Sequence, residues 1–273
     1  MSKPIAGDWL LEQADSQKDR KKIENLLTLR EKVLKTNQFI GSNELFSLRL
    51  RGKEIWFHEN SAFSSLEVYV EIFKENNHCL LPDFAESRCQ LIVDVGANEG
   101  YYALKMKESN PGCQLICIEP NPYALETLKR NLLSNGVQNI IVISKAVFSS
   151  TTRIQLELIE QIKSIGGLGI KIAERPWLQD NWIKHFEAEA ESLDFMLRDF
   201  LQTRIDILKI DVEGVEMEVL LGAEETLKRV DRIVVECHSD ELKKKVTEFL
   251  QSKGRQCVWE ENLGRYYGDL YFR

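Results

Sequence analysis

The sequence has 273 residues, of which 43% are hydrophobic and 29% charged, a balance typical of one soluble globular domain or of one domain with an appendage. The net charge of −7 argues against a nucleic-acid partner, because binding a polyanion usually needs a basic face and no long Lys/Arg cluster occurs. No apolar run reaches the roughly 18 residues of a membrane span. The first residues carry no apolar signal-peptide core, which favours a cytoplasmic protein with reduced, inert cysteines.

The first 85 residues carry no pattern that suggests chemistry. Apolar residues at helical spacing predict a helix over residues 8–37. Alternation around a central Arg-Gly-Lys predicts a β-hairpin over 46–58, and a further helix follows at 64–76. We interpret residues 1–85 as an N-terminal helical and hairpin extension, which could cap a site or form the surface of a homodimer.

From residue 91 onward, strands and helices alternate. Strands are predicted at 91–95, 114–119, 139–147, 206–210, 232–238, 255–260 and 266–272, and helices at 101–110, 122–135, 215–228 and 239–253. This alternation predicts a Rossmann-like, doubly wound α/β domain over 86–273, with a mainly parallel seven-stranded sheet and helices on both faces. Right-handed crossovers then place the carboxyl ends of the parallel strands at one edge, where ligands bind.

Residues 150–192 interrupt the alternation. They contain strand-like stretches and glycines at 166, 167 and 169, which predict a hairpin-like insertion. Such an excursion at the carboxyl edge of a sheet is often a lid or a substrate loop, and a surface decoration is the alternative. Trp177 and Trp182 could line an apolar acceptor pocket or could belong to the core.

Two motifs at the predicted carboxyl edge indicate a nucleoside cofactor. In VDVGANEG, residues 93–100, the glycines allow a tight strand-to-helix turn, while Asp94 disfavours phosphate and could attract an amine or a sulfonium. Glu119 ends the next strand about 20 residues later, where an acid can accept hydrogen bonds from both ribose hydroxyls. Together the motifs predict an adenosine cofactor without a pyrophosphate. A plain tight turn and an exposed acid are the alternatives.

Four acids follow the strand at 206–210 within eight positions: Asp211, Glu213, Glu216 and Glu218. Asp211 and Glu213 come directly after the strand, so we expect them in the cleft, where they could orient an acceptor hydroxyl or amine. Glu216 and Glu218 lie at the start of the next helix, where the helix dipole favours carboxylates. The sequence therefore predicts two acids for the site and two mainly for the helix.

His238, at the predicted end of the strand over 232–238, is the best candidate for a general base, because imidazole titrates near neutral pH. A purely structural hydrogen bond is the alternative. Asp211, Glu236 and His238 could instead hold a divalent metal ion. Their spacing matches no metal motif, so a divalent metal stays an option that the sequence does not support.

Six segments between about residues 60 and 260 carry a resemblance to a known family: VDVGANEGYYALKMK, CIEPNPYALETLKRNL, SKAVFS, SLDFMLRDF, LKIDVEGVEMEVLLGA and IVVECH. In this order they closely resemble the FkbM-type family of S-adenosylmethionine-dependent methyltransferases, which have the class I methyltransferase fold. The Asp-x-Glu-Gly-x-Glu and Glu-x-His motifs are the specific part. The glycine turn alone would indicate only a class I methyltransferase.

The resemblance also implies site residues. The cofactor would contact the glycine turn, the end of the second strand, the stretch after the third strand and the first cleft acid: Asp94, Gly96, Ala97, Asn98, Gly100, Glu119, Pro120, Asn121, Lys145, Ala146 and Asp211. Asp211, Glu213 and His238 would be catalytic, and Glu236 would complete the cleft. Glu99 would add negative charge beside the amino acid part of the cofactor.

The reaction that the resemblance implies is O-methylation of a hydroxyl on a small molecule, a sugar or other glycan, or a glycolipid. Two alternatives stay open from the residues. An acidic cleft is compatible with N- or carboxyl-methylation of a peptide or an amine. The chain could also be a cofactor-binding interaction module without catalysis, although the intact glycine turn and cleft residues count against it.

Overall fold

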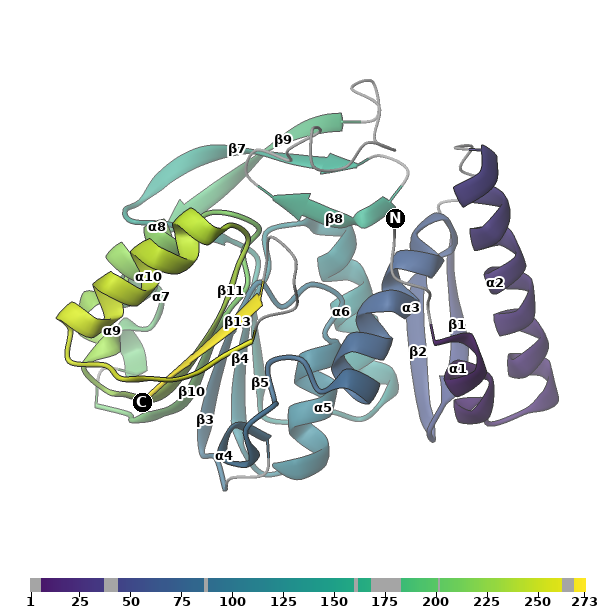
Figure 1. Ribbon diagram of the computed structural model, residues 1–273, viewed down its shortest axis with the longest axis horizontal. Helices are drawn as coiled ribbons and strands as arrows, with labels where there is room; N and C mark the ends of the chain where they lie inside the picture. Colours follow the sequence, from purple (N-terminus) through teal and green to yellow (C-terminus); the bar gives the residue numbers. More distant parts are fainter. Residues whose placement is uncertain are drawn as a thin grey trace.

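The computed structural model describes residues 6–36, 44–85, 88–159, 162–167, 183–200, 202–261 and 268–273. Its centre is a seven-stranded sheet in the order β12-β13-β11-β10-β3-β4-β5 (Figure 1). The strands are β3 (Leu91–Val95), β4 (Gln114–Ile118), β5 (Ile140–Ile143), β10 (Ile205–Ile210), β11 (Val230–Cys237), β12 (Cys257–Glu260) and β13 (Gly268–Phe272). Neighbours from β11 to β5 pair in parallel, and β13 is antiparallel to both β11 and β12. The predicted mainly parallel, seven-stranded α/β fold is confirmed.

Helices cover both faces of this sheet (Figure 1). On one side lie α5 (Tyr101–Ser109) and α6 (Pro122–Ser134), and on the other lie α7 (Leu193–Met196), α8 (Glu216–Leu221), α9 (Glu224–Leu227) and α10 (Asp240–Ser252). Alternate strand residues feed two buried apolar layers, so Ile92 and Ile207 face one layer, whereas Val93 and Leu208 face the other. Burial of both faces explains why these strands are continuous apolar runs.

The N-terminal segment packs against α6. It contains α1 (Gly7–Gln13), α2 (Gln17–Thr36), β1 (Leu45–Leu50), β2 (Lys53–His58), a 3-10 turn (Glu59–Ser61), α3 (Ala62–Val70), a π-helix (Glu71–Glu75) and α4 (Pro82–Ala85). The predicted hairpin is confirmed, and Arg51 and Gly52 both have positive φ, as a two-residue hairpin turn requires. The Asn131 side chain of α6 bonds to the backbone of Trp56, which joins the hairpin to the main sheet layer.

Three predicted elements are interrupted. The helix expected over 8–37 breaks at residues 14–16, where Ala14 bridges to Leu50 and the Ser16 hydroxyl accepts from the backbone N–H of Asp19 as a new helix start. The strand expected over 139–147 splits into β5 and β6 (Ala146–Val147), which join different sheets. The helix expected over 215–228 divides into α8 and α9 at Gly222, where a Cβ would lie 2.2 Å from the carbonyl oxygen of Phe148.

The insertion forms a second, four-stranded sheet in the order β6-β9-β7-β8, with β7 (Thr152–Ile159), β8 (Ile162–Gly167) and β9 (Ile183–Glu191) (Figure 1). The hairpin-like prediction is confirmed, because β7 pairs antiparallel with both β8 and β9. Gly166 and Gly167 lie in β8, while Gly169, Trp177 and Trp182 lie outside the described residues. In the described part of the chain, every helix is too short or too polar to cross a lipid bilayer.

Candidate functional site

A pocket of about 730 Å³, measured with its open mouth, lies at the carboxyl ends of β3, β4 and β10. The central sheet contributes its polar wall, and the second sheet contributes an apolar wall made of Ile154, Leu156 and Phe186. The predicted residues that line it are Gly96, Asn98, Glu119, Pro120, Asn121, Lys145, Ala146, Asp211 and Glu213. The other predicted cofactor residues, Asp94, Ala97 and Gly100, are not among the lining residues.

The glycine turn brings β3, β4 and β10 close together. Gly96 has a φ of 78°, and a Cβ there would lie 1.7 Å from the carbonyl oxygen of Asp211. The N–H groups of Gly96 and Ala97 both donate to the carbonyl oxygen of Ile118. Gly100 has a different function, because its missing side chain leaves room for Leu128 of α6. The sequence motif therefore encodes close backbone packing as well as a ligand-facing turn.

Glu119 is held by the backbone of its neighbours. Its two carboxylate oxygens accept from the N–H groups of Asn98 and Asn121, each at 2.8 Å. Burial raises the pKa of this carboxyl to about 7, although both hydrogen bonds oppose the shift. Each oxygen keeps a lone pair for a further donor. Two ribose hydroxyls would fit this acid, and the buried Oδ1 of Asn98, which has no hydrogen-bond partner among the described residues, would fit an amino group.

Lys145 links the pocket to the insertion. Its ammonium group lies 3.3 Å from the carboxylate of Glu189 and 2.9 Å from that of Glu191, both on β9. It directly precedes Ala146, where the chain passes from the central sheet into the second sheet. These ion pairs therefore hold β9 of the second sheet next to the end of the central sheet, so that the apolar and polar walls of the pocket face each other.

Asp94 is fully buried and does not face the pocket. Its carboxylate lies 3.2 Å from the ammonium group of Lys209, which also donates to the carbonyl oxygen of Gly96 at 2.8 Å. The Asp94 carboxylate is thus paired with an internal lysine, and its attraction for a cationic group of the ligand stays a prediction. Burial raises the pKa of Asp94, and Lys209 opposes that shift.

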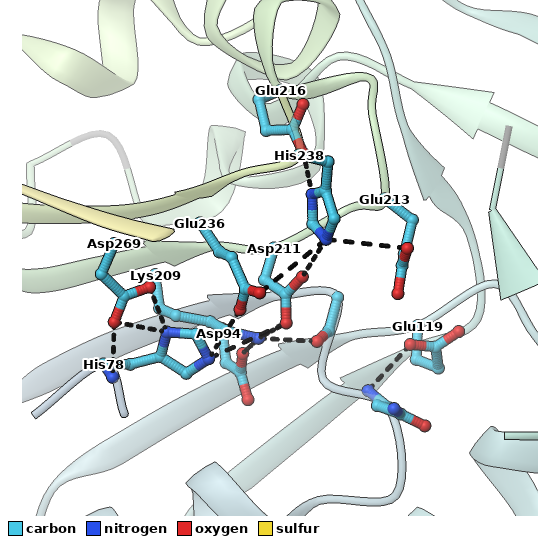
Figure 2. A network of polar contacts seen from close by, with 12 residues as sticks. His78, Asp94, Glu119, Lys209, Asp211, Glu213, Glu216, Glu236, His238 and Asp269 are labelled. Carbon is cyan, nitrogen blue, oxygen red and sulfur yellow. Dashed lines mark hydrogen bonds and ion pairs between the residues drawn. The ribbon is translucent and has the colours of Figure 1, made fainter. Parts of the chain in front are cut away.

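His238 lies at the carboxyl end of β11 within a group of acids (Figure 2). Its Nδ1 is 2.7 Å from Glu216 Oε1, and its Nε2 lies 3.6 Å from Glu213 and 3.9 Å from both Asp211 and Glu236. Burial would lower the pKa of His238, but the surrounding carboxylates, led by Glu213, raise it well above its usual value. The carboxylates around the ring therefore favour its protonated form in the absence of ligands.

Glu216 was assigned mainly to the helix that follows the strand, and the structure adds a second contact. It accepts from the N–H of Gly214 at the start of α8, as a helix-terminal acid should. It is also fully buried and bonds to His238, which fixes the direction of the imidazole ring. Glu218 makes neither of these contacts, so only one of the two helix acids belongs to the cluster.

The sequence reasoning missed three members of this cluster: His78, Lys209 and Asp269 (Figure 2). His78 comes from the N-terminal segment, and its Nδ1 lies 2.9 Å from Asp269 Oδ1 on β13. Its Nε2 lies 3.5 Å from Glu236 and 3.8 Å from Asp211. A usable signal was present, because Lys209 and Asp269 interrupt apolar strands, and a charge in a buried strand requires a partner.

Two groups of side chains could hold a metal ion among the described residues. One comprises His78, Glu236 and Asp269, and the other comprises the predicted Asp211, Glu236 and His238. Both groups already contain protein cations, since Lys209 lies 3.2 Å from Asp211 and His78 lies beside Glu236. These cations offset part of the charge of the acids, and a divalent metal at either group stays a prediction.

Glu99 points away from the pocket. It is 2% exposed, and its carboxylate accepts from the hydroxyl of Tyr101. Burial raises its pKa to about 7, opposed by hydrogen bonds from Ser65 and Tyr101. The expectation that Glu99 adds charge beside the cofactor is wrong, because its side chain faces the N-terminal segment.

The chain is similar to known methyltransferases. A model of the methyltransferase FkbM domain matches residues 94–257. Methyltransferase sdnD of Sordaria araneosa is 28% identical over 71% of this chain and 84% of its own length. The 2-O-methyltransferase NoeI of Sinorhizobium fredii is 23% identical over 77% of this chain and 84% of its own length.

A further relative is the 31-O-demethyl-FK506 methyltransferase FkbM of Streptomyces tacrolimicus, which is 26% identical over 81% of this chain and 93% of its own length. Among solved structures, one from Streptococcus mutans, assigned as a SAM-dependent methyltransferase, superposes with a TM-score of 0.50 at 8% identity. It covers 85% of this chain and 56% of that chain, and at such identity it supports the fold alone.

Proposed function

We propose, since this chain belongs to the FkbM methyltransferase family, that it methylates a hydroxyl oxygen of a small molecule, a sugar or a glycolipid. It is an S-adenosylmethionine-dependent methyltransferase. The choice of oxygen is supported by the names of two relatives, which describe O-methylation. The observation that carries the proposal is His238, whose Nδ1 is held by Glu216 and whose Nε2 faces the pocket acids Asp211 and Glu213.

The pocket suits the cofactor. Glu119 would hold the ribose, Gly96 and Asn98 the methionine part, and Lys145 and Ala146 would lie near the adenine, beside the apolar wall of the second sheet. When bound, S-adenosylmethionine supplies a methyl group on a positively charged sulfur, which becomes a neutral thioether once the methyl has passed to a nucleophile. Asp211 and Glu213, at the carboxyl end of β10, face the same space and would favour a positive charge there.

In the proposed reaction, His238 Nε2 accepts the proton of the acceptor hydroxyl, and Asp211 and Glu213 hold that hydroxyl in line with the methyl group. Glu216 accepts from Nδ1–H, which leaves the Nε2 lone pair for the acceptor once the imidazole is neutral. Positive charge brought beside the carboxylates would lower the pKa of His238 toward neutrality. Asp211 stays ionised, because Lys209, His78 and His238 together outweigh burial and hold its pKa below the usual value.

An amine acceptor is the second candidate. The pocket mouth carries Glu213 with a side chain 37% exposed, and Asp211 with 24% exposed, so a cationic acceptor would be attracted. A protonated amine must lose its proton before it attacks, and His238 would serve in the same way. The two candidates therefore differ in the acceptor and not in the residues.

The homodimer suggested by the N-terminal segment stays a prediction.

The first experiment is calorimetric titration with S-adenosylmethionine and S-adenosylhomocysteine, with and without magnesium. We expect micromolar binding that Glu119→Ala weakens at least about tenfold, because hydrogen bonds to a carboxylate are lost. Glu218→Ala on α8 is the matched control, and this variant should bind S-adenosylmethionine normally. No binding to the wild-type chain would contradict the assignment of the pocket.

Acceptors are then tested by transfer of a labelled methyl group to a panel of methyl glycosides and secondary alcohols, with primary amines and peptides as the opposing set. Labelled ether products from the alcohols would support O-methylation. Products from the amines alone would replace it with the second candidate.

A further inference from the structure

We propose that His78 is a positioning residue of the methyl-transfer site, which holds the carboxylates of Glu236 and Asp211 in place from the side opposite His238. The inference rests on the proposed function, which places Asp211 on the acceptor side of the pocket, and Glu236 lies 3.9 Å from the same His238 nitrogen as Asp211. It adds a histidine and an aspartate, His78 and Asp269, that both lie outside the region matched by the family model, residues 94–257.

The chain fixes His78 firmly. Its backbone N–H donates to Asp269 Oδ2 at 2.7 Å, and its ring Nδ1 lies 2.9 Å from Asp269 Oδ1. His78 has a φ of 62°, and the preceding helix ends at Asn76 with a φ of 63°. Histidine adopts this left-handed conformation only at an energetic cost, which the surrounding contacts must offset. The contacts with Asp269 therefore keep both the backbone and the ring of His78 in one position.

The register of the strands explains why His78 meets these acids. Glu236 of β11 is paired with Asp269 of β13, and Lys209 of β10 is paired with Asp94 of β3. All four side chains point to the same face as the buried Ile92 and Ile207, which is the face that α5 covers. The groups around the His78 ring are thus Asp269 and Tyr271 from β13, Glu236 from β11, Lys209 and Asp211 from β10, Asp94 from β3, and Tyr102 from α5.

A purely structural bond to Asp269 would need only one ring nitrogen. The second nitrogen of His78 faces Glu236 Oε2 at 3.5 Å and Asp211 Oδ2 at 3.8 Å (Figure 2). The other oxygen of each carboxylate faces His238 Nε2, in both cases at 3.9 Å. Glu236 and Asp211 therefore lie between two imidazoles, so a change at His78 reaches His238 through them.

The consequence is electrostatic. The carboxylates of Glu236 and Asp211 repel each other, and burial together with Asp211 raises the pKa of Glu236 to about 8, a shift that the charges of His238 and His78 oppose. His78 and Lys209 supply positive charge on the buried side, which leaves the opposite oxygens directed at His238 and the pocket. Loss of His78 should therefore misplace the acceptor-side carboxylates while the cofactor wall, built from Glu119 and its neighbours, stays intact.

His78→Asn tests this directly. Asparagine tolerates the left-handed conformation and its amide can replace the Nδ1–H bond to Asp269, but it has no atom at the position of Nε2. We expect kcat to fall about 10–100-fold with an unchanged Kd for S-adenosylmethionine, while the thermal midpoint falls only as far as loss of the charged His78–Asp269 pair requires. His185→Asn, on the exposed part of β9, is the control and should leave kcat unchanged. A stable His78→Asn variant with wild-type kcat would overturn the proposal.

A double-mutant cycle with Glu236→Gln tests the route. If His78 acts through Glu236, the double variant should be no slower than the worse single variant. Additive losses would show that His78 acts elsewhere. If His78→Asn does not fold, Asp269→Asn provides the second variant, since it leaves the imidazole present and removes the anchor that directs it.

Histidine ring resonances in NMR spectra give a readout that needs no acceptor. In the ligand-free protein, His78→Asn should shift the ring signals of His238, whereas His185→Asn should not. An unmoved His238 signal would contradict the inference even in a protein that methylates normally. Failure of the proposed function would look different: S-adenosylmethionine binds, no member of the acceptor panel is methylated, and the His238 signal still responds to His78→Asn.

Discussion

The proposed cofactor side and the proposed acceptor side of the cleft are built in different ways. On the cofactor side, Glu119 is fixed by two backbone N–H groups and Gly96 by its φ value, so the site is a property of the chain path. On the acceptor side, the groups that matter are charged side chains from β10, β11, β13 and the N-terminal segment, and they hold one another (Figure 2). Cofactor binding on the first side should be lost when the backbone is disturbed. Positioning of the acceptor on the second side should be lost when any one charge is removed.

The largest expected effect is on the acceptor side. His238→Asn keeps a donor for Glu216 but removes the atom that would accept the proton, so kcat should fall by about 10²–10⁴ with S-adenosylmethionine affinity retained. Steady-state rates of labelled methyl transfer measure it. Glu218→Gln is the control and should leave the rate unchanged. Equal losses of kcat in the two variants would contradict the role of His238 as the base.

On the cofactor side, the corresponding change is Gly96→Ala. It places a Cβ against the carbonyl of Asp211 at a φ of 78°, and we expect the free energy of unfolding to fall by about 2–4 kcal/mol. Gly136→Ala is the matched control, because Gly136 also has a positive φ of 63° but has no atom within 4 Å of its added Cβ, so about 1 kcal/mol is expected. Urea denaturation compares them, and equal losses would rule out the close approach as the cause.

The next effect is on stability as a function of pH. Burial would lower the pKa of His78, but Asp269 raises it to about 9 from the usual 6.5. A raised pKa in the folded state means that the pair stabilises the fold fully below pH 6.5 and that its contribution disappears as the pH rises through about 9. The loss is at most about 3 kcal/mol. Denaturation midpoints between pH 6 and 10 should show it, and Asp269→Asn should flatten the curve. A wild-type curve that is already flat would exclude a charged pair.

The smallest effect concerns the pH dependence of the rate. The base must be neutral to act, and the carboxylates around His238 raise its pKa well above the usual 6.5, so kcat/KM should increase with pH into the alkaline range. Glu213→Gln removes the carboxylate that raises this pKa most, and the acid limb should move down by about one pH unit. If the acid limb of the kcat/KM profile does not move in Glu213→Gln, the titrating group is not His238.

The cofactor side could be predicted from the sequence because its signals are local. The glycine turn and the acid that ends the next strand both fall within 93–119, and the Asn121 side chain that follows caps α6 by accepting from the N–H of Tyr123. The acceptor side could be predicted only at Asp211, Glu213, Glu236 and His238. His78 and Asp269 are separated by 191 positions, and no periodicity in a sequence reports a pairing across that distance.

The helix breaks were missed for a related reason. The segment over 215–228 has the apolar spacing of one helix, and its interruption depends on the carbonyl of Phe148, which reaches Gly222 only after the second sheet has formed. A glycine inside a helical pattern was the available sign, since it lowers helix propensity by about 1 kcal/mol relative to alanine. Propensity alone does not decide such cases.

The position of β13 has a consequence for synthesis on the ribosome. This strand lies inside the sheet, between β11 and β12, yet it is translated after both. At about 5–20 residues per second, the 191 positions between His78 and Asp269 correspond to roughly 10–40 s. During that interval the nascent chain contains a histidine without its aspartate, and once residue 237 has been made it also contains β11 with an unpaired edge. Chaperones that bind exposed strand edges would meet the chain before β13 has been made.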